Sequence, residues 1–298
     1  MTSSASIARR QILLLVFCQA LLYVNTVTLI AVNGLAGLAL APSPLLATLP
    51  VTTYILGSAL ATVPASLAMG RYGRRAGFMS GAALAIAGTT LAAAAVLAGS
   101  FALLCAGTFI VGLYNAFGQY LRFAAADVAD AYEPSLKERA ISWVLAGGLA
   151  GGIVGPELSK LTREALAAPY AGSYAALAAV ALIALTLASR VRIPMPAPRT
   201  LGAARPLAEI ARQPTFVVAV LVGAISYGAM NLLMTATPLA MKVCGFGYPE
   251  AADIIKWHVV AMFAPGFFTG TVVRRYGAPK VMLVGCVLMA ATIAIAHA

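Results

Sequence analysis

Long apolar runs constrain this chain more than any other feature. Runs of about 20 residues with almost no charge recur along its 298 residues, and the 20 basic and 9 acidic residues gather between them. About 20 helical residues cross a hydrocarbon core about 30 Å thick. A soluble domain needs a charged surface, whereas here 61% of residues are hydrophobic and only 10% are charged. We therefore predict an integral membrane protein.

Helices fit the apolar runs better than the strands of a barrel. Barrel strands are segments of about 10 residues that alternate apolar and polar, and residues 82–97 show no alternation. The expected fold is an all-α polytopic membrane helix bundle. About nine spans are predicted, at residues 11–33, 46–69, 77–97, 101–125, 140–159, 171–189, 215–240, 251–273 and 280–297. The first is too long for a signal peptide.

The charges of the connecting loops predict the orientation. With the N-terminus inside, sixteen of the 20 basic residues fall on the cytoplasmic side and three on the other, while Lys256 falls within a span. Basic loops stay in the cytoplasm, so the N-terminus is predicted to be cytoplasmic. This bias also explains the net charge of +11 without any nucleic-acid partner.

The longest cytoplasmic connection divides the chain. Residues 190–214 are rich in Pro and Arg and are predicted to link an N-terminal six-helix bundle, residues 1–189, to three helices of a C-terminal bundle, residues 215–298. An internal repeat supports the division: loops 70–75 and 274–280 share Arg-Tyr-Gly followed by a basic residue, at matching places in the two halves. Repeated bundles are typical of transporters.

These loops resemble the major facilitator superfamily, whose signature between helices 2 and 3 is Gly-x-x-x-Asp-Arg-x-Gly-Arg-Arg/Lys. The first copy departs from it with Ser66 at the leading Gly and Gly70 at the Asp, and the second copy has Arg274 at the Asp. The positions that match are Arg71, Gly73, Arg74 and Arg75 in the first copy, and Gly270, Arg275, Gly277 and Lys280 in the second. Family members normally have twelve helices, so the resemblance implies that the last three are lacking.

The resemblance implies a cytoplasmic gate. Three arginines in one short loop repel one another unless carboxylates pair with them, and Asp127 is the expected partner. Arg139 could pair with Asp127 instead. The gate residues are Arg71, Gly73, Arg74, Arg75, Asp127, Arg139, Arg275 and Gly277. The alternative is a set of solvated charges that only fix the topology.

Glycines recur every four residues in the fifth span. Gly147, Gly151 and Gly155 are predicted to form a smooth face for close helix packing, and Pro156 follows them. The same stretch resembles part of the family's antiporter motif, which slightly favours export over import.

Polar residues within spans indicate where a solute would pass, because burying them in lipid is costly. In the family, helices 1, 4, 7 and 10 line the central cavity, and three polar stripes lie on the first, fourth and seventh spans. The predicted cavity residues are Gln19, Tyr23, Thr26, Asn115, Gln119, Arg122, Tyr227 and Asn231. The alternative is hydrogen bonding between helices.

Four ionisable residues could couple transport to protons, namely Glu157, Asp253, Lys256 and His258. The alternative for Asp253 and Lys256 is that they mark the interfacial end of their span and snorkel.

Together these features predict a secondary active transporter of a bacterial inner membrane that moves a small organic solute by alternating access. The rival is a non-transporting membrane protein: a receptor, an assembly partner or an inactive remnant. No catalytic motif is present, so no enzyme is predicted. Four separated cysteines and two histidines indicate neither metal nor cofactor. The expected partners are membrane lipid and the solute; the oligomeric state stays open.

Overall fold

The computed structural model describes residues 4–193 and 206–296, and all the regular structure in those residues is helical. The helices are α1 (Ser4–Leu40), η1 (Pro44–Leu46), α2 (Leu49–Tyr72), α3 (Arg74–Leu97), α4 (Phe101–Gly118), α5 (Leu121–Tyr132), η2 (Pro134–Leu136), α6 (Lys137–Thr162), α7 (Ala171–Ala188), α8 (Leu207–Ala211), α9 (Pro214–Val243), α10 (Tyr248–Phe263), α11 (Gly266–Tyr276) and α12 (Ala278–Ala296).

Eight stretches of the described residues are long and apolar enough to cross a membrane, and each overlaps a predicted span. The polytopic helical fold is thus as predicted. The span expected at 251–273 is instead divided into α10 and α11 on either side of Ala264–Pro265. Proline has no N–H to continue a helix and disfavours helical backbone in the residue before it, which accounts for the interruption.

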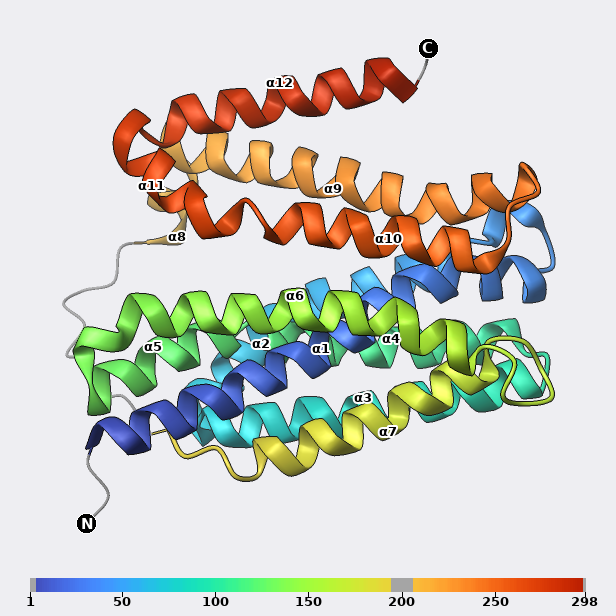
Figure 1. Ribbon diagram of the computed structural model, residues 1–298, viewed down its shortest axis with the longest axis horizontal. Helices are drawn as coiled ribbons and strands as arrows, with labels where there is room; N and C mark the ends of the chain where they lie inside the picture. The colour runs from blue at the N-terminus through green and yellow to red at the C-terminus, as the bar shows by residue number, and fades with distance from the viewer. Residues whose placement is uncertain (1–3, 194–205, 297–298) are drawn as a thin grey trace. The chain divides into compact units, whose positions relative to one another are not determined.

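The chain divides into two compact units, of which the first comprises Met1–Pro196 and Thr235–Phe263. In this unit α1 packs along α6 and α7, and α4 packs against both α2 and α3 (Figure 1). More than half of the most apolar window of α1 is buried. The first helix therefore forms the centre of the unit.

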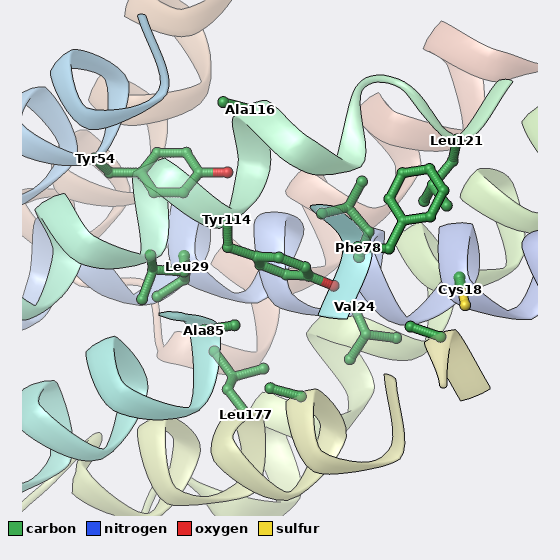
Figure 2. Packing of buried hydrophobic residues seen from close by; sticks show 14 of the residues in the cluster. Cys18, Val24, Leu29, Tyr54, Phe78, Ala85, Tyr114, Ala116, Leu121 and Leu177 are labelled. Atoms are coloured by element: carbon green, nitrogen blue, oxygen red, sulfur yellow. The ribbon is translucent and has the colours of Figure 1, made fainter. Parts of the chain in front are cut away.

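The core of the first unit combines small residues with a few large side chains. Figure 2 shows Phe78, Tyr114 and Leu177 among the buried residues that fill it. Tyr174 is fully buried and its hydroxyl donates a 2.7 Å hydrogen bond to Asn33 Oδ1. The side-chain oxygen of Asn33 is thereby satisfied inside the bundle, as a buried polar atom must be.

The second unit comprises Ala197–Met234 and Ala264–Ala298. Of the predicted linker 190–214, residues 194–205 lie outside those described, and α8 and the start of α9 follow. The most apolar windows of α9 and α12 hold no buried residues. The sequence assigns α10 to the C-terminal bundle, yet α10 packs in the first unit, on α6. The division into six and three helices stays a prediction.

The two Arg-Tyr-Gly loops have the same backbone. Gly73 ends α2 at φ 89° and ψ 157°, and Gly277 ends α11 at φ 84° and ψ 149°. This region of conformational space is open to glycine almost alone. In both loops the preceding arginine also lies over the adjacent tyrosine ring, at 5.3 Å for Arg71 and 5.4 Å for Arg275.

Candidate functional site

The face of α6 that meets α1 is made of glycine. A Cβ atom added at Gly147, Gly151 or Gly155 would run into the backbone of α1. The carbonyl oxygens in the way belong, in the same order, to Val16, Ala20 and Val24. Thr28 Oγ1 also donates a 2.9 Å hydrogen bond to the Gly155 carbonyl, and Pro156 is buried beside it. The predicted packing face is therefore in contact, and the two helices run parallel.

A second glycine face of α6 meets α10. A Cβ atom at Gly148 would touch the Phe263 ring at 3.1 Å, and one at Gly152 would collide with a Val259 methyl group. Here the neighbouring atoms belong to side chains, and the order of contacts shows that α6 and α10 run antiparallel. One helix thus packs closely on two neighbours through two different glycine stripes.

Three of the predicted coupling residues meet near the end of this second face. Lys256 Nζ lies 2.6 Å from Glu157 Oε1 and 2.6 Å from Asp253 Oδ1. Lys160 Nζ lies 3.2 Å from Glu157 Oε1 and 2.5 Å from Asp253 Oδ1. The four side chains form a closed ring, the four-charge ring, in which acids and lysines alternate. His258 lies half-buried on α10, two residues beyond Lys256.

An aromatic and arginine cluster adjoins the four-charge ring. The Arg163 guanidinium lies 5.3 Å from the Tyr170 ring and 5.1 Å from the Tyr248 ring, and these rings meet edge-on at 5.8 Å. Burial raises the pKa of the Tyr170 hydroxyl, and Arg163 acts in the opposite direction. Tyr248 OH also lies 2.6 Å from Ser159 Oγ. The cluster joins α6 and its following loop to the start of α10.

The predicted cavity stripe of α1 is divided between packing and aromatic contacts. Gln19 is buried within the unit. Tyr23 packs edge-on against Phe263 of α10, with ring centroids 4.9 Å apart. Thr26 Oγ1 accepts a 3.2 Å hydrogen bond from Tyr54 OH of α2. Tyr23 and Thr26 therefore link α1 to two different neighbours.

The residues of the stripe predicted on the fourth span differ in their exposure. Asn115 is buried, and its Nδ2 atom donates a 2.9 Å hydrogen bond to Ser58 Oγ of α2. Gln119, at the break between α4 and α5, is exposed and donates to Asn115 Oδ1 at 3.5 Å. Arg122 is exposed and lies over the Phe123 ring at 4.9 Å. Asn115 thus joins two helices, whereas Gln119 and Arg122 are accessible.

The stripe of the seventh span lies on α9, in the second unit. Tyr227 is 56% exposed. Asn231 is half-buried, and its Nδ2 atom donates a 2.9 Å hydrogen bond back to the Tyr227 carbonyl. Both remain candidates for contact with a solute.

Residues 15–297 match the family model of the Major Facilitator Superfamily. The chain belongs to the major facilitator superfamily. The predicted family is thus confirmed, and with it the prediction of a transporter rather than an enzyme, because the relatives of this major facilitator are transporters.

Two relatives and one solved structure show how far the likeness extends. The riboflavin transporter RfnT of Brucella anthropi is 42% identical over 292 residues, which cover 97% of this chain and 73% of that protein. YddS of Bacillus subtilis, an uncharacterized MFS-type transporter, is 27% identical, with coverage of 82% and 59%. The crystal structure of a D-xylose–proton symporter has a TM-score of 0.62 and 18% identity, covering 89% of this chain and 69% of that one. The last likeness is one of fold alone.

The predicted gate of this major facilitator contains one ion pair. Arg74 Nε lies 3.0 Å from Asp127 Oδ2, and the two side chains are 21% and 27% exposed. The Arg74 guanidinium also lies 5.8 Å from the Tyr120 ring. Arg71, Arg75 and Arg139 are exposed. The structure therefore brings Asp127 together with Arg74 rather than with Arg139, and the role of this pair as a gate stays a prediction.

Sequence reasoning missed several members of the seam between α6 and α10. Lys160 completes the four-charge ring, and Phe263 and Val259 fill the second glycine face. One signal was present in the sequence: residues 157–160 read Glu-x-x-Lys and residues 253–256 read Asp-x-x-Lys. The match becomes meaningful only once the two helices are known to be antiparallel neighbours.

Proposed function

We propose that this major facilitator carries riboflavin, or a solute with the same planar heteroaromatic ring, across a bacterial inner membrane by alternating access. One observation carries the proposal: RfnT, a riboflavin transporter, is 42% identical along 97% of the chain. The chain spans 73% of that relative, and we propose that it shares the relative's transport activity.

The chemistry of the candidate site supports a planar aromatic solute. Tyr23 and Phe263 form an aromatic pair beside Gly148, where no side chain of α6 intervenes. Aromatic side chains bind flat rings by stacking or edge contacts. Riboflavin also carries a polyhydroxyl chain, for which the exposed amide of Gln119 offers hydrogen bonds.

The proposed orientation places the N-terminus in the cytoplasm. The positive-inside bias of the loops supports it, because the basic residues of the two Arg-Tyr-Gly loops then lie inside. The ends of α6 and α10 that carry the four-charge ring would then lie outside. A reporter enzyme that works only after export should be inactive when fused at Thr200 and active when fused at Glu164. The reverse pattern contradicts the orientation.

Proton coupling is a separate proposal. Glu157 and Asp253 are already engaged by two lysines each, which supports a role in pairing helices. His258 lacks such an arrangement among the described contacts, so it is the better candidate for a proton carrier. His258→Gln should remove the effect of a protonophore on transport if the coupling exists.

The proposed function is tested by transport of labelled riboflavin. The chain would be expressed in a bacterial riboflavin auxotroph, and both uptake and export would be followed, because the partial antiporter motif favours export. Tyr23→Ala should reduce transport at least tenfold, and Tyr23→Phe should retain most of it. Labelled D-xylose serves as the control solute. Membrane-inserted protein that moves no riboflavin in either direction rules the proposal out.

A further inference from the structure

The same acid-x-x-lysine pattern occurs on α6 and α10, and the two helices place these patterns face to face. Residues three apart lie on one side of a helix, so Glu157 and Lys160 share a face, as do Asp253 and Lys256. In an antiparallel pair the order of one helix is reversed against the other. Each acid therefore meets the lysine of the opposite helix, and the four-charge ring follows directly from the pattern.

The contacts of the ring allow it to open without leaving any of its four charges unpaired. Two of its four contacts cross between helices, Lys160 to Asp253 and Lys256 to Glu157. The other two lie within one helix each, at i and i+3. If the helices part, both lysines keep the acid of their own helix. The large cost of leaving a buried charge unpaired therefore does not arise, and the acid side chains are already 46% exposed at Glu157 and 42% at Asp253.

The rest of this seam is separable as well. Gly148 and Gly152 of α6 face side chains of α10, whereas the glycines that face α1 lie against its backbone. The hydroxyl contact between Ser159 and Tyr248 also joins side chains only. When helices part, side chains can adopt new rotamers or form hydrogen bonds with water. A backbone carbonyl held by a hydrogen bond, as at Gly155, ties its helix more firmly.

We propose that the four-charge ring is a latch that closes the outer side of the transporter between α6 and α10 and opens once in each transport cycle. The proposal rests on the alternating-access mechanism and on the orientation proposed above, but not on the identity of the solute. Lys160 is thereby assigned a functional role alongside Glu157, Asp253 and Lys256. The adjoining Arg163 cluster covers the same end of the seam.

Charge reversal on one helix tests the latch. Glu157→Lys with Lys160→Glu keeps the net charge and the pair within α6, but sets like charges against each other across the seam. Asp253→Lys with Lys256→Asp does the same from α10. Combining all four substitutions restores opposite charges across the seam and is the matched control for folding, insertion and net charge.

The readout is a cysteine in place of the buried Ser159, after replacement of the four native cysteines. A membrane-impermeant maleimide is applied to the outside of intact cells. The parent should label slowly, both double reversals should label at least fivefold faster, and the fourfold variant should return to the parent rate. Ser159→Cys removes one contact with Tyr248, so all rates are compared within that background.

Transport is followed in parallel. The double reversals should lose most transport, because the outer side no longer closes, and the fourfold variant should regain it. Equal labelling of the parent and both double reversals overturns the latch. Fast labelling of the fourfold variant overturns it too, because the ring would then not be restored by charge alone. Labelling needs no substrate, so failure of the latch is distinguishable from failure of riboflavin transport.

Discussion

The two glycine faces of α6 differ in what they touch. The face formed by Gly147, Gly151 and Gly155 lies against backbone carbonyl groups of α1, and the face formed by Gly148 and Gly152 lies against side chains of α10. Both allow close approach of helices, which in a membrane depends on packing and hydrogen bonds rather than on the hydrophobic effect. We infer that the first face holds the bundle together and the second is made to separate.

The polar contacts follow the same division. On the α1 side, a side chain donates to backbone, from Thr28 to the Gly155 carbonyl. On the α10 side, the contacts join side chains, including the Tyr248–Ser159 hydroxyl pair. Glycine spacing alone therefore does not distinguish a fixed helix pair from one that we propose to move. The atoms opposite the glycines do.

The largest effect is expected from Gly151→Ala. Its new methyl group would meet the Ala20 carbonyl oxygen, and backbone cannot rotate aside. Overpacking costs about 1–3 kcal/mol and occasionally more, and we expect the upper end of that range. The yield of monodisperse protein in detergent and its thermal unfolding measure the loss. Gly223→Ala, where nothing lies within 4 Å of the new atom, is the matched control and should be at least as stable as the parent.

Gly152→Ala should be milder and should act on access. The new methyl group meets a methyl group of Val259, which can rotate at a cost of about 0.5–1.5 kcal/mol. The protein should fold, but a cysteine at position 159 should label faster from outside because the seam with α10 is loosened. If Gly152→Ala is as damaging as Gly151→Ala, the two faces are equivalent and the comparison fails.

Two hydroxyl deletions form the next pair. Thr28→Val and Tyr248→Phe each remove one hydrogen bond, worth about 1 kcal/mol. Thr28→Val should lower the unfolding temperature slightly and leave labelling at position 159 unchanged. Tyr248→Phe should raise that labelling, because its bond crosses the seam that opens. If α1 rather than α10 moves, Thr28→Val should raise the labelling and Tyr248→Phe should leave it unchanged.

Much of the fold follows from the sequence because the membrane imposes it. Helices buried in lipid must satisfy their own backbone, so apolar length alone indicated eight of the spans. The Arg-Tyr-Gly repeat likewise predicted equivalent loops, and Gly73 and Gly277 share their backbone angles because few other residues adopt them. The interruption at Ala264–Pro265 was missed because the apolar residues next to it continue the hydropathy expected of one span, although Pro265 itself marks the break.

The candidate site was harder to predict, because helix pairing is not a local property. Asn115 lies on a polar stripe with Gln119, yet it bonds to α2 rather than facing open space. Lys160 was predicted to be one of three basic residues in the outer loops, and its partner Asp253 is 93 residues away in sequence. Spacing reveals which residues share a face, and only packing reveals what that face meets.

The smallest effect is expected at the other predicted side of the membrane, from Asp127→Asn. The Arg74–Asp127 pair joins α3 to α5, and unlike the four-charge ring it has one contact and no partner acid within the same helix. Its side chains are about a quarter exposed, so its loss should cost at most about 1 kcal/mol. The Tyr120 ring continues to hold the arginine by a cation–π contact. If the pair acts as a cytoplasmic latch, Asp127→Asn should make a cysteine at the exposed position 119 more reactive from the cytoplasm, by at most about fivefold for a cost of this size. Exchange of the two charges, Arg74→Asp with Asp127→Arg, should partly reverse the change.

Unchanged reactivity and transport in normally inserted protein would mean that these arginines only set the orientation. Among the described residues, the four-charge ring would then be the one charged latch that the contacts support.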